Sequence, residues 1–217
     1  MIWLLTIPLA IAAVATATNR LAFKMAVPIA CAVIIAVFAA TLDASAASGV
    51  GRSTAIATAA AVIAALVVSA AGDYFLSRKG GSESYFIIGI ALYLIAHAGY
   101  LTAASMNATL WIPGLVVVLL VFVAYYGFVL RPAIPSTPLS IAVLVYLLLS
   151  CVVLAVSFGL VWDPLPSALF IAGISLIVVS DTAISVKEFL GRQWADPIIL
   201  PTYYLAHLAI TAALLLR

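Results

Sequence analysis

Charged side chains are scarce in this sequence. Lys, Arg, Asp and Glu make up 7% of its 217 residues and hydrophobic residues 67%, whereas an ordinary soluble domain is about 25% charged. This composition leaves no room for a soluble domain. The formal net charge of +2 comes without a basic patch or a reading element, so nothing supports nucleic-acid binding.

Cysteine and the usual metal-binding spacings are also nearly absent. Cys31 and Cys151 are the two cysteines. Both lie in long apolar stretches and far apart, which is typical of packing residues and not of a disulfide or a metal pair. Because no His-x-x-x-His or Glu-x-x-His spacing occurs, we predict no metal and no cofactor. Two Asp and two His spread over four stretches leave a metal-dependent lipid hydrolase as an alternative.

Long apolar stretches fill the chain instead. Each is long enough to cross a ~30 Å hydrocarbon core as a helix. The first ends in small residues, as a secretory signal does, but lacks a positively charged start, so we keep it as a helix. We predict an all-α integral membrane protein, a bundle of about eight transmembrane helices in a single domain over 1–217. The predicted spans are 1–18, 22–41, 54–73, 85–104, 110–130, 139–161, 166–186 and 198–216.

The basic residues predict the orientation of this bundle, because cytoplasmic loops carry an excess of Lys and Arg. The even-numbered loops and the termini carry only Arg52 and Arg217. Both termini are therefore expected outside the cytoplasm, in a bacterial inner membrane, with loops 19–21, 74–84 and 187–197 cytoplasmic. The odd-numbered loops and span ends carry Arg20, Lys24, Arg78, Lys79, Arg131, Lys187 and Arg192.

Five residues that can ionise lie within or at the edges of the spans: Lys24, Asp73, His97, Asp181 and His207. A carboxylate in hydrocarbon costs several kcal/mol, so intramembrane ionisable residues are functional by default. Asp181 could otherwise pair structurally with Lys24 or Lys187. Asp73 could be a solvated helix end beside a basic loop, and each histidine a buried neutral imidazole.

Helical spacing places these residues on two polar stripes. Tyr203, Tyr204, His207 and Thr211 share one face of the last span, and Gly89, Tyr93, His97 and Tyr100 share one face of the fourth. Together with Asp73, Asp181 and Lys24 they predict one pocket opening to the cytoplasmic side. Tyr100 and Trp111 are also typical of interfacial aromatic belts. Gly72, Gly89 and Gly173 are typical of close helix packing.

A weak internal recurrence accompanies these stripes. Asp73 with YLIAH at 93–97 recurs as Asp181 with YYLAH at 203–207, an offset of 108 to 110 residues. Four spans per half would keep both copies in one orientation. The recurrence suggests two parallel four-helix repeats, in which the third and fourth spans face the seventh and eighth across a pseudo-two-fold axis.

Four segments in succession resemble the YhhN-like lysoplasmalogenase membrane proteins: AGDYFL at 71–76, YFIIGIALYLIAHAGY at 85–100, AGISLIVVSD at 172–181 and PTYYLAHLAI at 201–210. The resemblance covers nearly the whole chain from Lys24 onward. Two positions depart from the family's usual pattern: Met25 replaces a proline and His207 a glutamine. The polar positions of the family correspond here to Lys24, Asp73, Gly89, His97, Tyr100, Asp181 and Tyr204.

The resemblance implies hydrolysis of the vinyl-ether bond of lysoplasmalogens to a fatty aldehyde and a glycerophospho-alcohol, with a lysolipid as substrate and membrane lipids as surroundings. A vinyl ether opens when its terminal alkene carbon is protonated, and water attacks the resulting oxocarbenium ion. We expect Asp181 as the acid and Asp73 as the carboxylate that stabilises the cation and deprotonates water. Lys24, Tyr93, His97, Tyr100, Tyr204 and His207 are the expected substrate-binding residues.

A third reading is a non-enzymatic lipid or proton-coupled transporter, because midplane His and Asp residues and parallel repeats also occur in transporters. Such transporters contain broken helices at matching positions of their two halves. The prolines Pro113, Pro135 and Pro138 lie at or near span ends, so the sequence offers no such pair.

Overall fold

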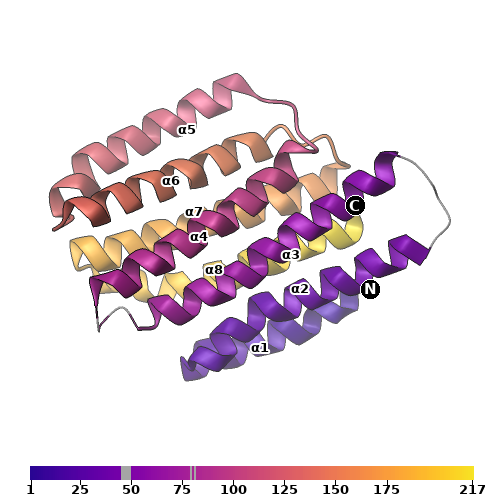
Figure 1. Cartoon of the computed structure of the whole chain (residues 1–217), viewed down its shortest axis with the longest axis horizontal. Coiled ribbons are helices and arrows are strands. Elements are labelled where there is room, and N and C mark those ends of the chain that lie inside the picture. The colour runs from indigo at the N-terminus through magenta and orange to yellow at the C-terminus, as the bar shows by residue number, and fades with distance from the viewer. Residues whose placement is uncertain (45–49, 79, 81) are drawn as a thin grey trace.

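The computed structural model describes residues 1–44, 50–78, 80 and 82–217, and these residues form a bundle of eight long helices (Figure 1). Seven of the described helices are long and apolar enough to cross a membrane, while the first, Ile2–Thr18, is shorter. The predicted all-α multi-pass fold is confirmed. The helices are α1 (Thr6–Thr18), α2 (Leu21–Ala44), α3 (Val50–Leu76), α4 (Glu83–Ser105), α5 (Ile112–Ala124), α6 (Thr137–Ser157), α7 (Pro164–Leu190) and α8 (Asp196–Leu216).

Asparagine, glycine and serine residues mark several helix ends at one end of the bundle. α1 ends at Asn19 and α7 at Gly191, both in the left-handed region with φ of 53° and 65°, as is common just past a helix C-terminus. Ser82 and Ser136 cap the starts of α4 and α6 by accepting hydrogen bonds from backbone N–H groups. The Ser136 hydroxyl also donates to Glu83 at 2.6 Å, which ties these two helix starts together.

Two predicted spans differ from the observed helices. The span 110–130 is α5 followed by a π-helix, Tyr125–Leu130. The span 139–161 is wrong at its end, because α6 stops at Ser157 and the chain beyond pairs with the α4–α5 connection. In this pairing the Thr109 N–H donates to the Gly159 carbonyl at 2.8 Å. A Cβ at Gly159 would lie 1.7 Å from the Thr109 oxygen, so only glycine allows the pairing.

Both chain termini lie at the same end of the bundle (Figure 1). At the opposite end α1, α3 and α7 finish and α2, α4, α6 and α8 begin, and we call this the basic end because Arg20, Arg78, Arg131 and Arg192 lie there. Lys79, counted above among the basic residues of this end, lies outside the described residues.

The helix neighbours recur between the two halves of the chain. α1 packs on α2, α2 on α3, and α3 very closely on α4; correspondingly α5 packs on α6, α6 on α7, and α7 very closely on α8. The contact of α4 with α6 also has a counterpart in the contact of α8 with α2. A shift by four helices maps one set of neighbours onto the other, which is the arrangement that two parallel repeats produce.

Glycines allow these close approaches. A Cβ at Gly173 would lie 2.6 Å from the Ile210 side chain, one at Gly89 2.8 Å from Leu76, and one at Gly72 2.9 Å from the Tyr93 ring. The packing role predicted for these three glycines is therefore confirmed. The last of the contacts is the most informative for function, because it fixes the space available to Tyr93.

The C-terminus is anchored at the end opposite the basic end. The Arg217 guanidinium donates to the Asn107 side-chain oxygen at 2.6 Å and lies over the Trp162 ring at 4.7 Å. Asn107 in turn donates to Thr58 on α3 at 2.9 Å. Partial burial lowers the pKa of Arg217, but a guanidinium stays charged in proteins, so this contact persists at physiological pH.

Candidate functional site

A polar cavity of about 560 Å³ opens among α1, α2, α3, α7 and α8 near the basic end. Asp73 from α3 and Asp181 from α7 both line it, although 108 residues separate them in the sequence. Tyr93 of α4 lines the same cavity, and Lys24 and Lys187 contribute positive charge to it. The carboxylates therefore share one solvent-accessible space with phenol and ammonium groups.

Asp73 is held by two phenol groups from two other helices. The Tyr93 hydroxyl donates to one carboxylate oxygen, and the Tyr203 hydroxyl of α8 donates to the other at 3.1 Å. Asp73 is half-buried and bound by phenols from α4 and α8, so it is more than a solvated helix end beside a basic loop. The neighbouring Arg78 guanidinium lies over the Tyr74 ring at 4.1 Å.

Tyr93 and Tyr203 occupy equivalent positions in the proposed repeats, 110 residues apart, and their hydroxyls lie 3.4 Å from each other. Equivalent residues of two copies meet only where a two-fold axis passes between them. The candidate site therefore lies where such an axis would pass, and Asp73 is bound there by one tyrosine from each half.

Asp181 lies deeper and has a different partner. Its side chain is 8% exposed, and its Oδ2 lies 3.7 Å from Nε2 of His97, which is 2% exposed. His97 Nδ1 lies 2.9 Å from the Tyr93 carbonyl oxygen. A carbonyl only accepts hydrogen bonds, so in a neutral His97 the proton sits on Nδ1 and Nε2 presents a lone pair to Asp181.

The facing atoms, Asp181 Oδ2 and His97 Nε2, have no hydrogen-bond partner within the part of the chain that the structure describes. Two acceptors facing each other in a buried site repel unless one of them carries a proton. Of the two alternative partners for Asp181, Lys24 and Lys187, the second is instead paired with Asp196. The geometry around Asp181 therefore accommodates a protonated carboxyl group.

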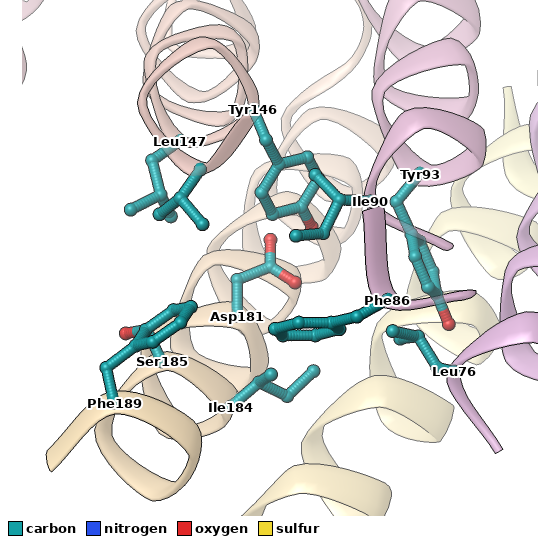
Figure 2. Close-up of a pocket in the computed structure, with 11 residues that line it drawn as sticks. Leu76, Phe86, Ile90, Tyr93, Tyr146, Leu147, Asp181, Ile184, Ser185 and Phe189 are labelled. Atoms are coloured by element: carbon teal, nitrogen blue, oxygen red, sulfur yellow. The ribbon is translucent and has the colours of Figure 1, made fainter. Parts of the chain in front are cut away.

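A second, narrow cavity of about 40 Å³ lies on the other side of Asp181, between α4, α6 and α7 (Figure 2). Phe86, Ile90, Leu147 and Phe189 give it an apolar lining. The side chains of Tyr146 and Ser150 on α6 also lie beside the Asp181 carboxyl, and Figure 2 shows the Tyr146 hydroxyl turned toward it.

The other residues predicted from the sequence fall into two groups. Tyr93 and Lys24 line the polar cavity. His97 lies next to Asp181 but is not among the residues that line the cavity. Tyr100, Tyr204 and His207 are buried among the helices and, in the described part of the chain, are not among the cavity-lining residues. The interfacial reading of Tyr100 is wrong: it is 1% exposed, and its hydroxyl lies 3.4 Å from His207 Nδ1.

Two residues at the site, Tyr146 and Ser150, were not singled out from the sequence, and a third, Tyr203, was placed on the polar stripe of the last span but given no role. Tyr203 is the repeat equivalent of Tyr93, so the 110-residue offset could have identified it. Tyr146 and Ser150 are one helical turn apart in an otherwise apolar span, and this i, i+4 polar pair was an available signal. The resemblance instead directed attention to Tyr204, whose hydroxyl faces away from any described partner.

The described residues contain no group of three or more His, Cys, Asp and Glu side chains arranged to hold a metal ion. His97 and Asp181 meet, but Asp73 is engaged with tyrosines and His207 lies against Tyr100. The four side chains that suggested a metal site thus separate into different environments.

No curated protein and no solved structure matches the chain. The model of the YhhN family matches residues 19–214, so it includes both carboxylates, the tyrosines that bind Asp73 and every helix from α2 onward. Together with the sequence segments around Asp73 and Asp181, this match shows that the chain belongs to the YhhN family.

Proposed function

We propose that the protein hydrolyses the vinyl-ether bond of lysoplasmalogens, as its resemblance to the lysoplasmalogenases of its family implies. The observation that carries the proposal is that Asp73 and Asp181 line one cavity while each has different partners. Paired carboxyl groups in unlike environments divide into an acid and a base. Vinyl-ether hydrolysis needs both.

Asp181 is the acid in this proposal. Burial favours the neutral form of a carboxyl group, and so does the lone pair of His97 Nε2 beside Oδ2. The Tyr146 and Ser150 hydroxyls beside this carboxyl act in the opposite direction, so the acid assignment rests on burial and on His97. The carboxyl proton moves to the terminal alkene carbon of the vinyl ether, and the π electrons form the new C–H bond. The carbon attached to oxygen becomes an oxocarbenium ion, and Asp181 becomes a carboxylate.

Asp73 is the base. Two hydroxyl donors, from Tyr93 and Tyr203, favour its ionised form, and its negative charge stabilises the nearby cation. Water from the cavity attacks the oxocarbenium carbon and gives its proton to Asp73, which forms a hemiacetal. The hemiacetal collapses to a fatty aldehyde and the free glycerol hydroxyl, and transfer of the proton from Asp73 back to Asp181 restores the site.

The phosphate of the lysolipid fits the basic residues of the cavity. Lys24 lies at the start of α2 and lines the cavity on the side of the basic end. Lys187, which is paired with Asp196, lines the same side near the end of α7. A phosphate beside them would lie at headgroup level when the basic end faces the cytoplasm. The glycerol backbone then reaches inward to the carboxyls.

Product analysis of the purified, reconstituted protein tests the proposal. We expect aldehyde release from a lysoplasmalogen and none from the saturated alkyl-ether analogue. Asp181→Asn and Asp73→Asn should each lower turnover by roughly 10²–10⁴-fold, the usual contribution of a general acid or base, and the double variant should be little worse than either single one. Asp163→Asn, at the opposite end of α7, is the matched control and should retain wild-type activity.

Two outcomes would contradict this function. Substantial aldehyde release by a well-folded Asp181→Asn protein would remove the acid assignment. Movement of intact lysolipid across the membrane of reconstituted vesicles, with no release of aldehyde, would instead favour the transporter reading. Loss of turnover on metal removal, restored by adding metal back, would favour the metal-dependent hydrolase.

A further inference from the structure

The polar and apolar cavities meet at a small set of shared residues. Leu76, Tyr93, Asp181 and Ile184 line both of them. On one side of this boundary lie ammonium and carboxylate groups of the polar cavity. On the other side lie Phe86, Leu147 and Phe189, in the narrow cleft between α4, α6 and α7 (Figure 2).

A single-chain ether lipid changes character at the bond that the proposed reaction cleaves. The glycerophosphate on one side of the vinyl ether is charged, and the hydrocarbon on the other side is apolar. A carboxyl group that protonates this bond must therefore lie where a polar space meets an apolar one. Asp181 lies at such a boundary, because its side chain lines both the polar and the apolar cavity.

We propose that the cleft between α4, α6 and α7 binds the hydrocarbon chain of the substrate. This inference rests on the proposed function. The cleft is far narrower than the polar cavity, about 40 Å³ against about 560 Å³. As it stands the cleft is too small to hold an alkenyl chain, so a chain enters only when the leucine and phenylalanine side chains that line the cleft move apart.

The space between α4 and α8 does not offer an apolar path for the chain. There Tyr93 and Tyr203 face each other and Asp73, and these three side chains hydrogen-bond to each other. From Asp181 the apolar lining continues between α4, α6 and α7, along Ile90, Leu147 and Phe189. An alkenyl chain would therefore leave the carboxyls on the α6 side.

Chain-length preference tests the subsite, with two adjacent residues of α6 as the matched pair. Leu147 lines the cleft and is 6% exposed, whereas Leu148 faces outward and is 40% exposed. Leu147→Trp should lower kcat/KM for a long-chain lysoplasmalogen about tenfold, which is ~1.4 kcal/mol or the burial of nearly two methylenes. An analogue whose alkenyl chain is too short to reach Leu147 should be cleaved at an unchanged rate. Leu148→Trp should change neither value.

A photoreactive saturated ether lysolipid, with the reactive group within its chain, gives a second readout that requires no turnover. It should label peptides of α6 or α7 that line the cleft, and Leu147→Trp but not Leu148→Trp should reduce the labelling. Labelling of the cleft without aldehyde release from any vinyl ether would leave the chain subsite standing and overturn the reaction. Aldehyde release with unchanged chain preference in Leu147→Trp, or labelling confined to α1, α2 and α8, would overturn the subsite and leave the reaction standing.

Discussion

Removal of the Tyr93 hydroxyl is the most direct test of how Asp73 is held. In Tyr93→Phe the ring remains and only the donor to the Asp73 carboxylate is lost, so the Tyr203 hydroxyl at 3.1 Å is left as the remaining phenol donor. A hydrogen bond to a charged group contributes about 1.5–3 kcal/mol. If the ionised form of Asp73 is needed in the transition state, turnover should fall by roughly 10- to 150-fold.

Tyr126→Phe is the matched control for this substitution. Tyr126 is also half-buried, its hydroxyl donates to the Ser140 carbonyl at 2.9 Å, and it is not among the described residues that line either cavity. Both variants lose the hydrogen bonds of one half-buried phenol hydroxyl, so both should lose thermal stability. Only Tyr93→Phe should lose aldehyde release.

The assay is aldehyde production by reconstituted protein, measured together with the melting temperature of each variant. Equal activity in Tyr93→Phe and Tyr126→Phe at equal stability would refute the reasoning, because Asp73 would then need no phenol donor for its function. A severe loss of stability in Tyr93→Phe alone would instead assign the bond to folding.

Four further outcomes are expected. Gly72→Ala places a Cβ 2.9 Å from the hydrogen-bonded Tyr93 ring and should destabilise the protein by about 1–3 kcal/mol. Gly127→Ala, at a position with open space around it, should leave the stability unchanged. Similar melting temperatures for the two variants would contradict the packing argument. Arg217→Ala removes the contacts with Asn107 and Trp162. Thermal unfolding should show a melting temperature lower by a few degrees, and the preference for substrate chain length should not change. His207→Gln should retain most activity, because His207 does not line the described cavity and a glutamine can still accept from Tyr100; loss of turnover at unchanged stability would place His207 in the reaction. A reporter that works only outside the cytoplasm should be active when it is fused to the C-terminus. Activity of a reporter that works only in the cytoplasm would reverse the orientation and put the basic end of the bundle in the opposite leaflet.

The bundle and its helices could be predicted from the sequence, because hydrocarbon leaves the chain few choices. Backbone polar groups must be satisfied within each crossing segment, so an apolar stretch of sufficient length becomes a helix. The eight predicted spans accordingly agree with α1 to α8 to within a few residues at most ends. The early end of α6 arises from the pairing of Thr109 with Gly159, a contact between distant segments that local hydrophobicity does not encode.

The candidate site was predictable only in part. The cost of burying a carboxylate singled out Asp73 and Asp181 from composition alone, because such residues are rare in spans. Their partners followed from helix packing and not from spacing along one helix. The sequence placed Tyr203 and Tyr204 on the same polar stripe, and the resemblance favoured Tyr204. Tyr203 is the residue that binds Asp73, because adjacent side chains on a helix differ in direction by about 100° and only the position of α8 in the bundle decides which of them reaches Asp73.

The sequence by itself thus determined which residues could carry the chemistry, through the energetic penalty that a membrane imposes on charge. The tertiary structure decided how they differ: Asp73 accepts from two phenols, and Asp181 faces a histidine lone pair at the boundary between a polar and an apolar space. Those differences depend on contacts among α3, α4, α6, α7 and α8. No pattern along a single helix specifies them, because the packing of five helices brings these groups together.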